Sequence, residues 1–109
     1  MRQANVWYKQ ELAGLLTQHD DGSFSFVYFE DWLKDNSKPG VSLTLPKGHS
    51  PFSARYLFPF FVNLLPEGSN KEWLCKAQKI DLDDDFGVLM ISAKDDPIGA
   101  IQIQKIEQG

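Results

Sequence analysis

The sequence contains little of what builds covalent cross-links or metal sites, with one cysteine and two histidines among 109 residues. The single cysteine, Cys75, excludes an internal disulfide and is typical of a protein from a reducing compartment. His19 and His49 have no further histidine or cysteine at ligand spacing, whereas a zinc site needs three or four such ligands. We therefore expect neither a metal nor a cofactor.

The sequence also lacks an excess of basic residues and any long apolar run. Eleven lysines and arginines stand against fifteen acidic residues, which gives a formal net charge of −4. Proteins whose main partner is a nucleic-acid backbone carry a basic face instead. No apolar run approaches the ~20 residues that span a bilayer, and residues 1–5 lack the apolar segment of a signal peptide. These absences predict a cytoplasmic protein that binds neither a nucleic acid directly nor a membrane.

Catalytic patterns are missing as well. The eight glycines are dispersed, with no G-x-G pair and no G-K-[ST] sequence that would cradle a phosphate. Cys75 lies in the middle of a predicted helix and is expected to be a buried or idle thiol rather than a nucleophile. The acidic run 81–85 has Phe86 and Ser92 where a calcium loop needs glycine and glutamate, so its carboxylates are expected to favour a helix start. The residue inventory favours a binding role over catalysis.

What the first half of the chain does contain is a strong β pattern. Phe24, Phe26 and Tyr28 share one face by period-two alternation, and Asp21-Gly22 before them supplies a hairpin turn. Four strands are predicted, over residues 6–8, 12–17, 23–29 and 41–45. Residues 30–34 are too few for more than one helical turn.

The second half turns helical. Residues 57–65 are strongly apolar, with Pro59 tolerable only in a first turn and Pro66 forcing a stop. Ser69 and Glu72 form a capping box, which predicts a helix from Ser69 to about Lys79.

A further helix and a last strand complete the pattern. Asp83 is the predicted cap of the helix, because a stripe at i, i+3, i+4 and i+7 follows it. The stripe consists of Phe86, Leu89, Met90 and Ala93. Residues 101–104 alternate as a strand. The order β-β-β-β-α-α-α-β predicts one α+β domain over residues 1–109, with a small mixed or antiparallel, open barrel-like sheet and three short helices.

One stretch is specific enough to indicate a family. Residues 59–68, PFFVNLLPEG, resemble the signature of the N-terminal subdomain 1 of HipA-like serine/threonine kinase toxins. Other segments agree with that family in order and spacing, namely residues 12–16, 24–28, 32–33, 41–46, 84–89 and 96–101. Two features depart from it. Lys94 stands where the family usually has glycine, and these 109 residues contain none of the kinase domain, with its ATP, magnesium and catalytic aspartate, that follows in HipA-like toxins. The resemblance therefore implies a chain that phosphorylates nothing by itself.

A free-standing copy of this subdomain is similar to the HipS family, the small antitoxins of HipBST-type toxin–antitoxin operons. That resemblance implies a function: binding and neutralising HipT, a shortened serine/threonine kinase toxin that lacks this subdomain. It also implies HipB, a DNA-binding protein, as a further component of a ternary complex. The alternative is a structural subdomain of a full-length HipA-like kinase, without activity of its own. The opening Met1 and the polar end at residues 104–109 favour a natural small protein over an excised piece.

Four residues around the helix predicted to begin at Ser69 are candidates for contact with the kinase. Trp73 either projects beyond the domain or packs with Ala77 and Ile80 into the core, and both alternatives stand at this point. Glu67 and Asn70 border the same turn and can hydrogen-bond a partner, whereas Gly68 is expected to supply a backbone conformation. Six other residues are assigned to the core or its rim: Trp7, Trp32, Phe60, Phe61, Leu64 and Leu65.

Overall fold

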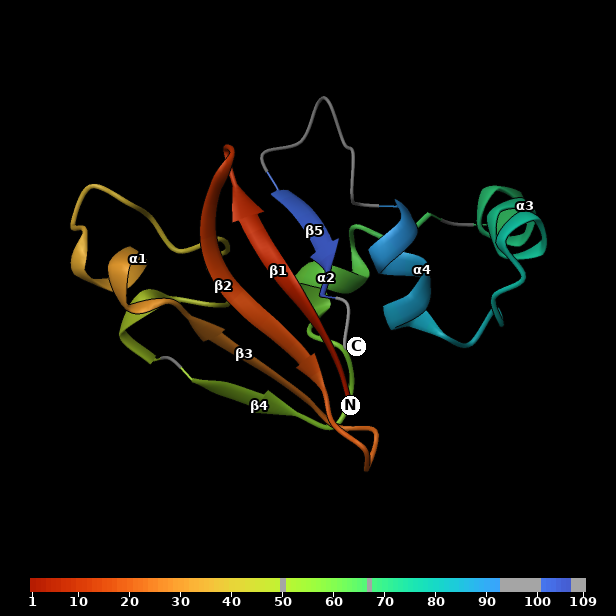
Figure 1. Ribbon diagram of the computed structural model, residues 1–109, viewed down its shortest axis with the longest axis horizontal. Coiled ribbons are helices and arrows are strands. Elements are labelled where there is room, and N and C mark those ends of the chain that lie inside the picture. Colours follow the sequence, from red (N-terminus) through yellow and green to blue (C-terminus); the bar gives the residue numbers. More distant parts are fainter. Residues whose placement is uncertain (50, 67, 93–100, 107–109) are drawn as a thin grey trace.

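The computed structural model describes residues 1–49, 51–66, 68–92 and 101–106, which form an α+β domain around one antiparallel sheet. The five strands lie in the order β4-β3-β2-β1-β5, and every neighbouring pair is antiparallel (Figure 1). Their bounds are β1 Arg2–Tyr8, β2 Glu11–Gln18, β3 Phe24–Tyr28, β4 Phe52–Ala54 and β5 Ile101–Lys105. The predicted fold class is confirmed, with the sheet antiparallel throughout.

The first hairpin turns without glycine. Lys9 and Gln10 link β1 to β2 with φ angles of +47° and +69°, the left-handed conformation that a two-residue hairpin loop requires. Gly22, by contrast, occupies the predicted Asp-Gly turn before β3 with a φ of +89°. The two turns therefore place three consecutive strands side by side.

A bulge lies in the middle of the β1–β2 pair. The register shifts between Val6 and Trp7, so that Val6 faces Gly14 while Trp7 faces Leu12. Ala13 is the extra residue, and both Ala13 and Gly14 are buried. A Cβ on Gly14 would lie 2.7 Å from the carbonyl oxygen of Val27 and 2.8 Å from the Phe26 ring, so only glycine fits against β3 here.

The prediction of a strand over residues 41–45 is wrong. These residues form a tight turn closed by an isolated bridge between Ser42 and Leu45, and the fourth strand is instead Phe52–Ala54. The Tyr28 hydroxyl fixes this turn, because it donates to the Leu45 carbonyl and accepts from the Val41 amide at 2.9 Å. Val41 and Leu45 are buried while Leu43 at the tip is fully exposed, so a turn produces the same alternation as a strand. The loop predicted after it contains a short 3-10 helix over Lys47–His49.

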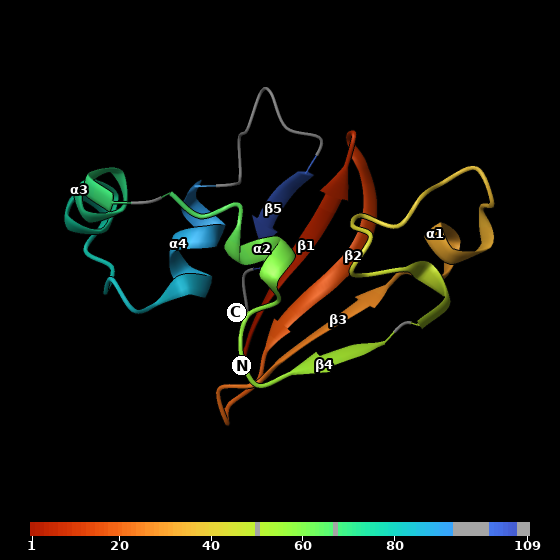
Figure 2. The same cartoon turned by 180° about the vertical axis from the view of Figure 1, so that it is seen from behind.

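The helices lie on one face and at both ends of the sheet (Figures 1 and 2). Their bounds are α1 Glu30–Lys34, α2 Pro59–Val62, α3 Gly68–Gln78 and α4 Asp85–Ser92. α2 and α4 lie beside each other over the sheet, while α1 and α3 lie at opposite ends of the molecule. In the described ranges, no helix has the length and apolar character needed to cross a membrane.

The core lies between the sheet and the two central helices. Phe26 from β3, Phe61 from α2 and Phe86 from α4 are fully buried, and the Phe26 and Phe61 ring centroids are 5.6 Å apart. Phe60, Leu64 and Leu65 are half-buried against this cluster, as the sequence predicts. Trp32 is buried as predicted, whereas Trp7 is half-buried and donates its indole N–H to the Gln104 side chain instead of packing against the core cluster.

Helix α4 begins one residue later than predicted. Its cap is Asp84 rather than Asp83, because the Asp84 carboxylate accepts a hydrogen bond of 3.2 Å from the Gly87 amide, three residues on. Phe86, Leu89 and Met90 are buried as predicted. Ala93 and Lys94 lie outside the described residues.

Substitution of Gly14 by alanine tests the close approach of β2 to β3. Because the new Cβ would overlap a backbone carbonyl that cannot move alone, Gly14→Ala should lower the free energy of unfolding by about 1–3 kcal/mol. Gly48→Ala is the matched control, since a Cβ at Gly48 meets no atom within 4 Å. Urea unfolding followed by circular dichroism measures both variants, and equal stabilities would contradict the interpretation.

Candidate partner-binding surface

Helix α3 stands apart from the sheet, at one end of the molecule (Figure 1). Its inner side meets the body near α4, where Lys71 Nζ lies 3.3 Å from the Asp85 carboxylate. Cys75 is the residue of α3 that is buried, and its sulfur lies 3.9 Å from the Asp81 carbonyl oxygen. The predicted buried thiol is therefore confirmed, and it marks the face of α3 that points inward.

Trp73 lies on the opposite, outward side of α3. Its side chain is 72% exposed, and its helical neighbours Asn70 and Ala77, three residues before and four after, are exposed too. The alternative in which Trp73 packs with Ala77 and Ile80 into the core is therefore wrong, because the inward positions of the helix belong to Lys71 and Cys75. A solvent-exposed tryptophan on an outlying helix is typical of a protein-contact surface.

The start of α3 differs in detail from the prediction. The helix begins at Gly68, so Ser69 lies within its first turn and the capping box at Ser69 does not mark the start. Gly68 has a φ of +59°, a left-handed conformation that glycine adopts without strain, which agrees with the backbone role predicted for it. Asn70 is exposed on the same turn. Glu67 lies outside the described residues, and its contact with a partner remains a prediction.

The end of α3 is closed by a left-handed lysine. Lys79 has a φ of +57°, and the Ile80 amide donates to the Cys75 carbonyl at 2.9 Å, which is the hydrogen bond of a Schellman motif. The helix therefore ends close to the predicted Lys79, although glycine is the residue that usually adopts the left-handed conformation found there. The turn redirects the chain toward α4 and leaves Leu82 47% exposed beside it.

An ion pair fixes α4, and through α4 the position of α3. Two nitrogens of the Arg2 guanidinium donate to the two Asp84 carboxylate oxygens at 2.6 and 3.1 Å, while Arg2 Nε donates to Gln18 at 2.7 Å. The guanidinium carbon also lies 5.1 Å from the centre of the Phe86 ring. The hydrogen bonds from Arg2, together with that from the Gly87 amide, outweigh partial burial and lower the pKa of Asp84.

The acidic run before α4 is used within the domain. Asp84 caps α4 and binds Arg2, and Asp85 binds Lys71. Across the described ranges, no three histidine, cysteine or acidic residues are grouped as a metal ion would require. The exposed side of α3 offers the Trp73 ring together with polar and charged side chains such as Asn70 and Lys76.

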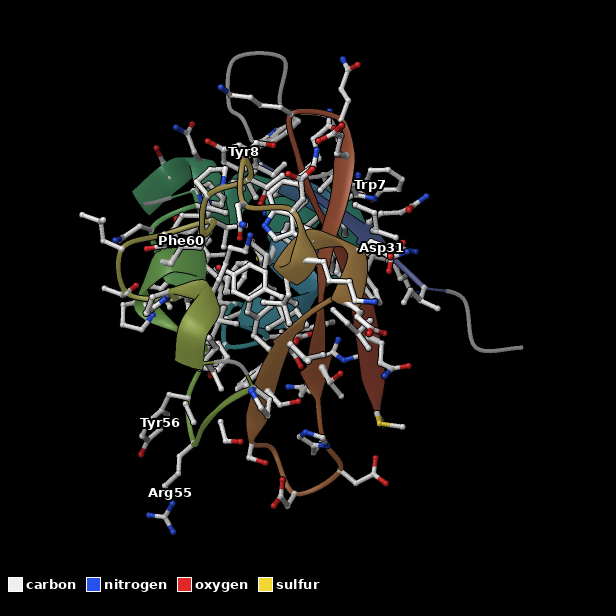
Figure 3. All side chains as sticks on the ribbon, turned by 90° about the vertical axis from the view of Figure 1, so that its left-hand side faces the viewer. Trp7, Tyr8, Asp31, Arg55, Tyr56 and Phe60 are labelled. Atoms are coloured by element: carbon white, nitrogen blue, oxygen red, sulfur yellow. The ribbon has the colours of Figure 1, made fainter. Side chains whose placement is uncertain are left out.

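A second group of exposed side chains has no counterpart in the sequence-based candidates. Arg55 and Tyr56 follow β4 and project away from the body (Figure 3), and Tyr56 is 80% exposed. Tyr56 directly precedes the apolar residues 57–65 and follows a strand that the sequence did not predict, so no local signal marks it as exposed.

The fold and its exposed helix define a small α+β domain that presents a tryptophan on an outlying helix. The chain belongs to the HipA N-terminal domain family, whose sequence profile matches residues 4–104. A solved structure of the N-terminal domain of HipA toxin superposes with a TM-score of 0.73 at 30% identity, covering 100% of this chain and 96% of that one.

Two relatives show the domain in chains of different length. The kinase-like protein Y4mE of Sinorhizobium fredii is 36% identical over 108 residues, which are 99% of this chain and 26% of Y4mE. An uncharacterised protein of Haemophilus influenzae is also 36% identical over 108 residues, which are 99% of this chain and 96% of that protein. The chain thus spans about a quarter of one relative and nearly all of the other.

The Arg2–Asp84 pair makes a pH-dependent contribution to stability. Arg2→Gln should lower the free energy of unfolding by about 1–2 kcal/mol near neutral pH, since it removes charge-assisted hydrogen bonds from a partly exposed carboxylate. The pKa of Asp84 is lower in the folded state, so its contribution is present above the unfolded value of 3.8 and disappears as the pH falls through the folded value. The difference in the free energy of unfolding between wild type and Arg2→Gln should therefore become smaller below pH 3.8.

Urea unfolding at several pH values from neutral down to acid measures this difference. Lys34→Gln is the control, because Lys34 makes an exposed pair with Glu30 that should contribute less than about 0.5 kcal/mol. If the difference in the free energy of unfolding between wild type and Arg2→Gln stays constant down to acid pH, Asp84 is not the group that makes the contribution pH-dependent.

Proposed function

We propose that this protein is an antitoxin that binds and neutralises a separate HipT-like serine/threonine kinase. The observation that carries the proposal is the exposed Trp73 on helix α3. In Y4mE, the matching domain is part of a longer, kinase-like chain. The Haemophilus relative supports it, because a protein of nearly the same length consists almost entirely of this domain. A domain encoded separately retains the surface that it uses when fused, and so can bind the same kinase body in trans.

The chemistry of the surface is consistent with inhibition by binding. Interface hot spots are enriched in tryptophan, and small neutral neighbours such as Asn70 and Ala77 leave the ring free to enter a pocket of the partner. The net charge of −4 suits a partner that binds phosphates and is therefore basic. We propose that the chain has no catalytic activity of its own, acts in the cytoplasm, and joins a HipB-like DNA-binding protein only through the kinase.

The second candidate function is that of a structural subdomain within a full-length HipA-like kinase. The coverage of Y4mE, in which the matching segment is 26% of the protein, favours this alternative. The two proposals differ in what the neighbouring gene encodes. A kinase that lacks this domain supports the antitoxin, whereas a single reading frame that continues into a kinase supports the subdomain.

Binding is tested by co-expression of the chain with the kinase encoded beside it, followed by size-exclusion chromatography. The two should elute together, with an interface of about 1,200–2,000 Å² as specific complexes bury. Separate elution at micromolar concentration would reject the proposal.

Substitution of Trp73 locates the interface. Trp73→Ala should weaken binding by about 2–4 kcal/mol, or roughly 30- to 1,000-fold, and abolish rescue of growth from the kinase. The fold should survive, because the ring is 72% exposed, and circular dichroism verifies this. Tyr56→Ala is the matched control, since Tyr56 is an equally exposed aromatic on another part of the surface. A folded Trp73→Ala protein that still rescues growth would remove Trp73 from the interface.

A further inference from the structure

A pocket lies where the start of β1 and the end of β5 meet α4, and Trp73 is not part of its lining. Its volume is about 390 Å³ and its apolar lining includes Ile80, Met90 and Ile91. Arg2, Asp84 and Lys105 contribute its charged groups. The pocket therefore combines an apolar wall from α4 with polar groups from the start of β1 and the end of β5.

The charges in this pocket are not balanced. Arg2 is neutralised by Asp84 through two hydrogen bonds, which leaves the exposed Lys105 as the cation available to a ligand. In the described part of the chain, Lys105 forms no ion pair. An occupant with an apolar side chain and a neighbouring carboxylate would match both the wall and this lysine.

The path of the backbone brings any continuation of the chain to this place. Lys105 pairs with Ala4 at the end of β5, and the next residue, Ile106, donates its amide to the Gln3 carbonyl at 3.0 Å. In longer relatives such as Y4mE, most of the protein lies outside the matching segment, and the family's domain is N-terminal. The polypeptide that leads from this domain to the rest of such a protein must therefore leave the sheet beside the pocket.

We propose that this pocket binds the N-terminal segment of the separate kinase, as an extended peptide with an apolar side chain between Ile80 and Ile91 and a carboxylate at Lys105. The proposal rests on the proposed function. A kinase that lacks this domain begins where the fused polypeptide would emerge, so its first residues lie next to the same pocket. A noncovalent contact between the pocket and the first residues of the kinase then replaces the peptide connection of the fused protein. It is a second binding contact in addition to the one proposed for Trp73.

Two variants and one truncation test the proposal by affinity for the kinase. Lys105→Glu should weaken binding by about fivefold, as reversal of an exposed ion pair does, and Ile91→Gln by about tenfold through loss of apolar contact. Removal of the first 15 residues of the kinase should weaken binding of the wild-type chain to a similar extent. The truncation should then make Lys105→Glu and Ile91→Gln nearly neutral, because the contact is already absent.

The control is Lys34→Glu, the same charge change on α1 at the far end of the molecule, which should leave affinity unchanged. Circular dichroism verifies that every variant is folded. If the truncation and the pocket variants are additive, or if the pocket variants bind as wild type does, the docking proposal is overturned while the proposed function stands. If the wild-type chain does not bind the kinase at all, both are overturned. Loss of self-association in Lys105→Glu, with kinase binding intact, would assign the pocket to a second copy of this chain instead.

Discussion

One bidentate ion pair joins the first strand of the domain to its last helix, beside the buried core that holds both. Arg2 and Asp84 are 82 residues apart in the chain, and their two hydrogen bonds join β1 to the cap of α4. The Asp84 carboxylate therefore accepts hydrogen bonds both from the Gly87 amide in the first turn of α4 and from the Arg2 guanidinium on β1. Lys71 of α3 in turn pairs with Asp85 of α4, so two ion pairs link β1, α4 and the helix that carries Trp73.

A second buried polar group has a comparable role at the other end of the sheet. The Tyr28 hydroxyl binds both ends of the turn at residues 41–45, so the last residue of β3 fixes a segment that has no strand partner. Burial raises the pKa of Tyr28, and the hydroxyl remains a neutral donor and acceptor. The domain thus combines a sheet to which this hydroxyl ties a turn with an outlying helix that contacts the body through Cys75 and the Lys71–Asp85 ion pair.

The sequence was sufficient for the parts of the fold that depend on local patterns. The face shared by Phe24, Phe26 and Tyr28 and the last strand follow from alternation. The first two strands follow from β-forming residues on either side of a turn, although β1 begins at Arg2 rather than at the predicted Val6. The strand predicted over residues 41–45 failed because a turn with buried ends and an exposed tip gives the same alternation. The cap of α4 was displaced by one residue, since Asp83 and Asp84 are equally good caps locally and only the distant Arg2 distinguishes them.

The candidate site was predictable in part for the same reason. Trp73 is a candidate because it lies near a family signature. Its exposure depends on which side of α3 faces inward, and that side is marked by the contacts of Lys71 with Asp85 and of Cys75 with Asp81, which helical periodicity alone does not predict. The pocket beside Lys105 could not be found from sequence, because its walls come from both ends of the chain and from α4.

The pairing of β1 with β5 has a consequence for synthesis of the protein. β1 lies between β2 and β5, so the strand that is synthesised first can complete its pairing only after the last strand has been made, and Arg2 likewise precedes its partner Asp84 by 82 residues. Such long-range pairing slows folding and delays completion of the sheet until the whole domain has left the ribosome. Until then one edge of β1 is open to other strands. The sheet is therefore complete only when its last strand pairs with its first.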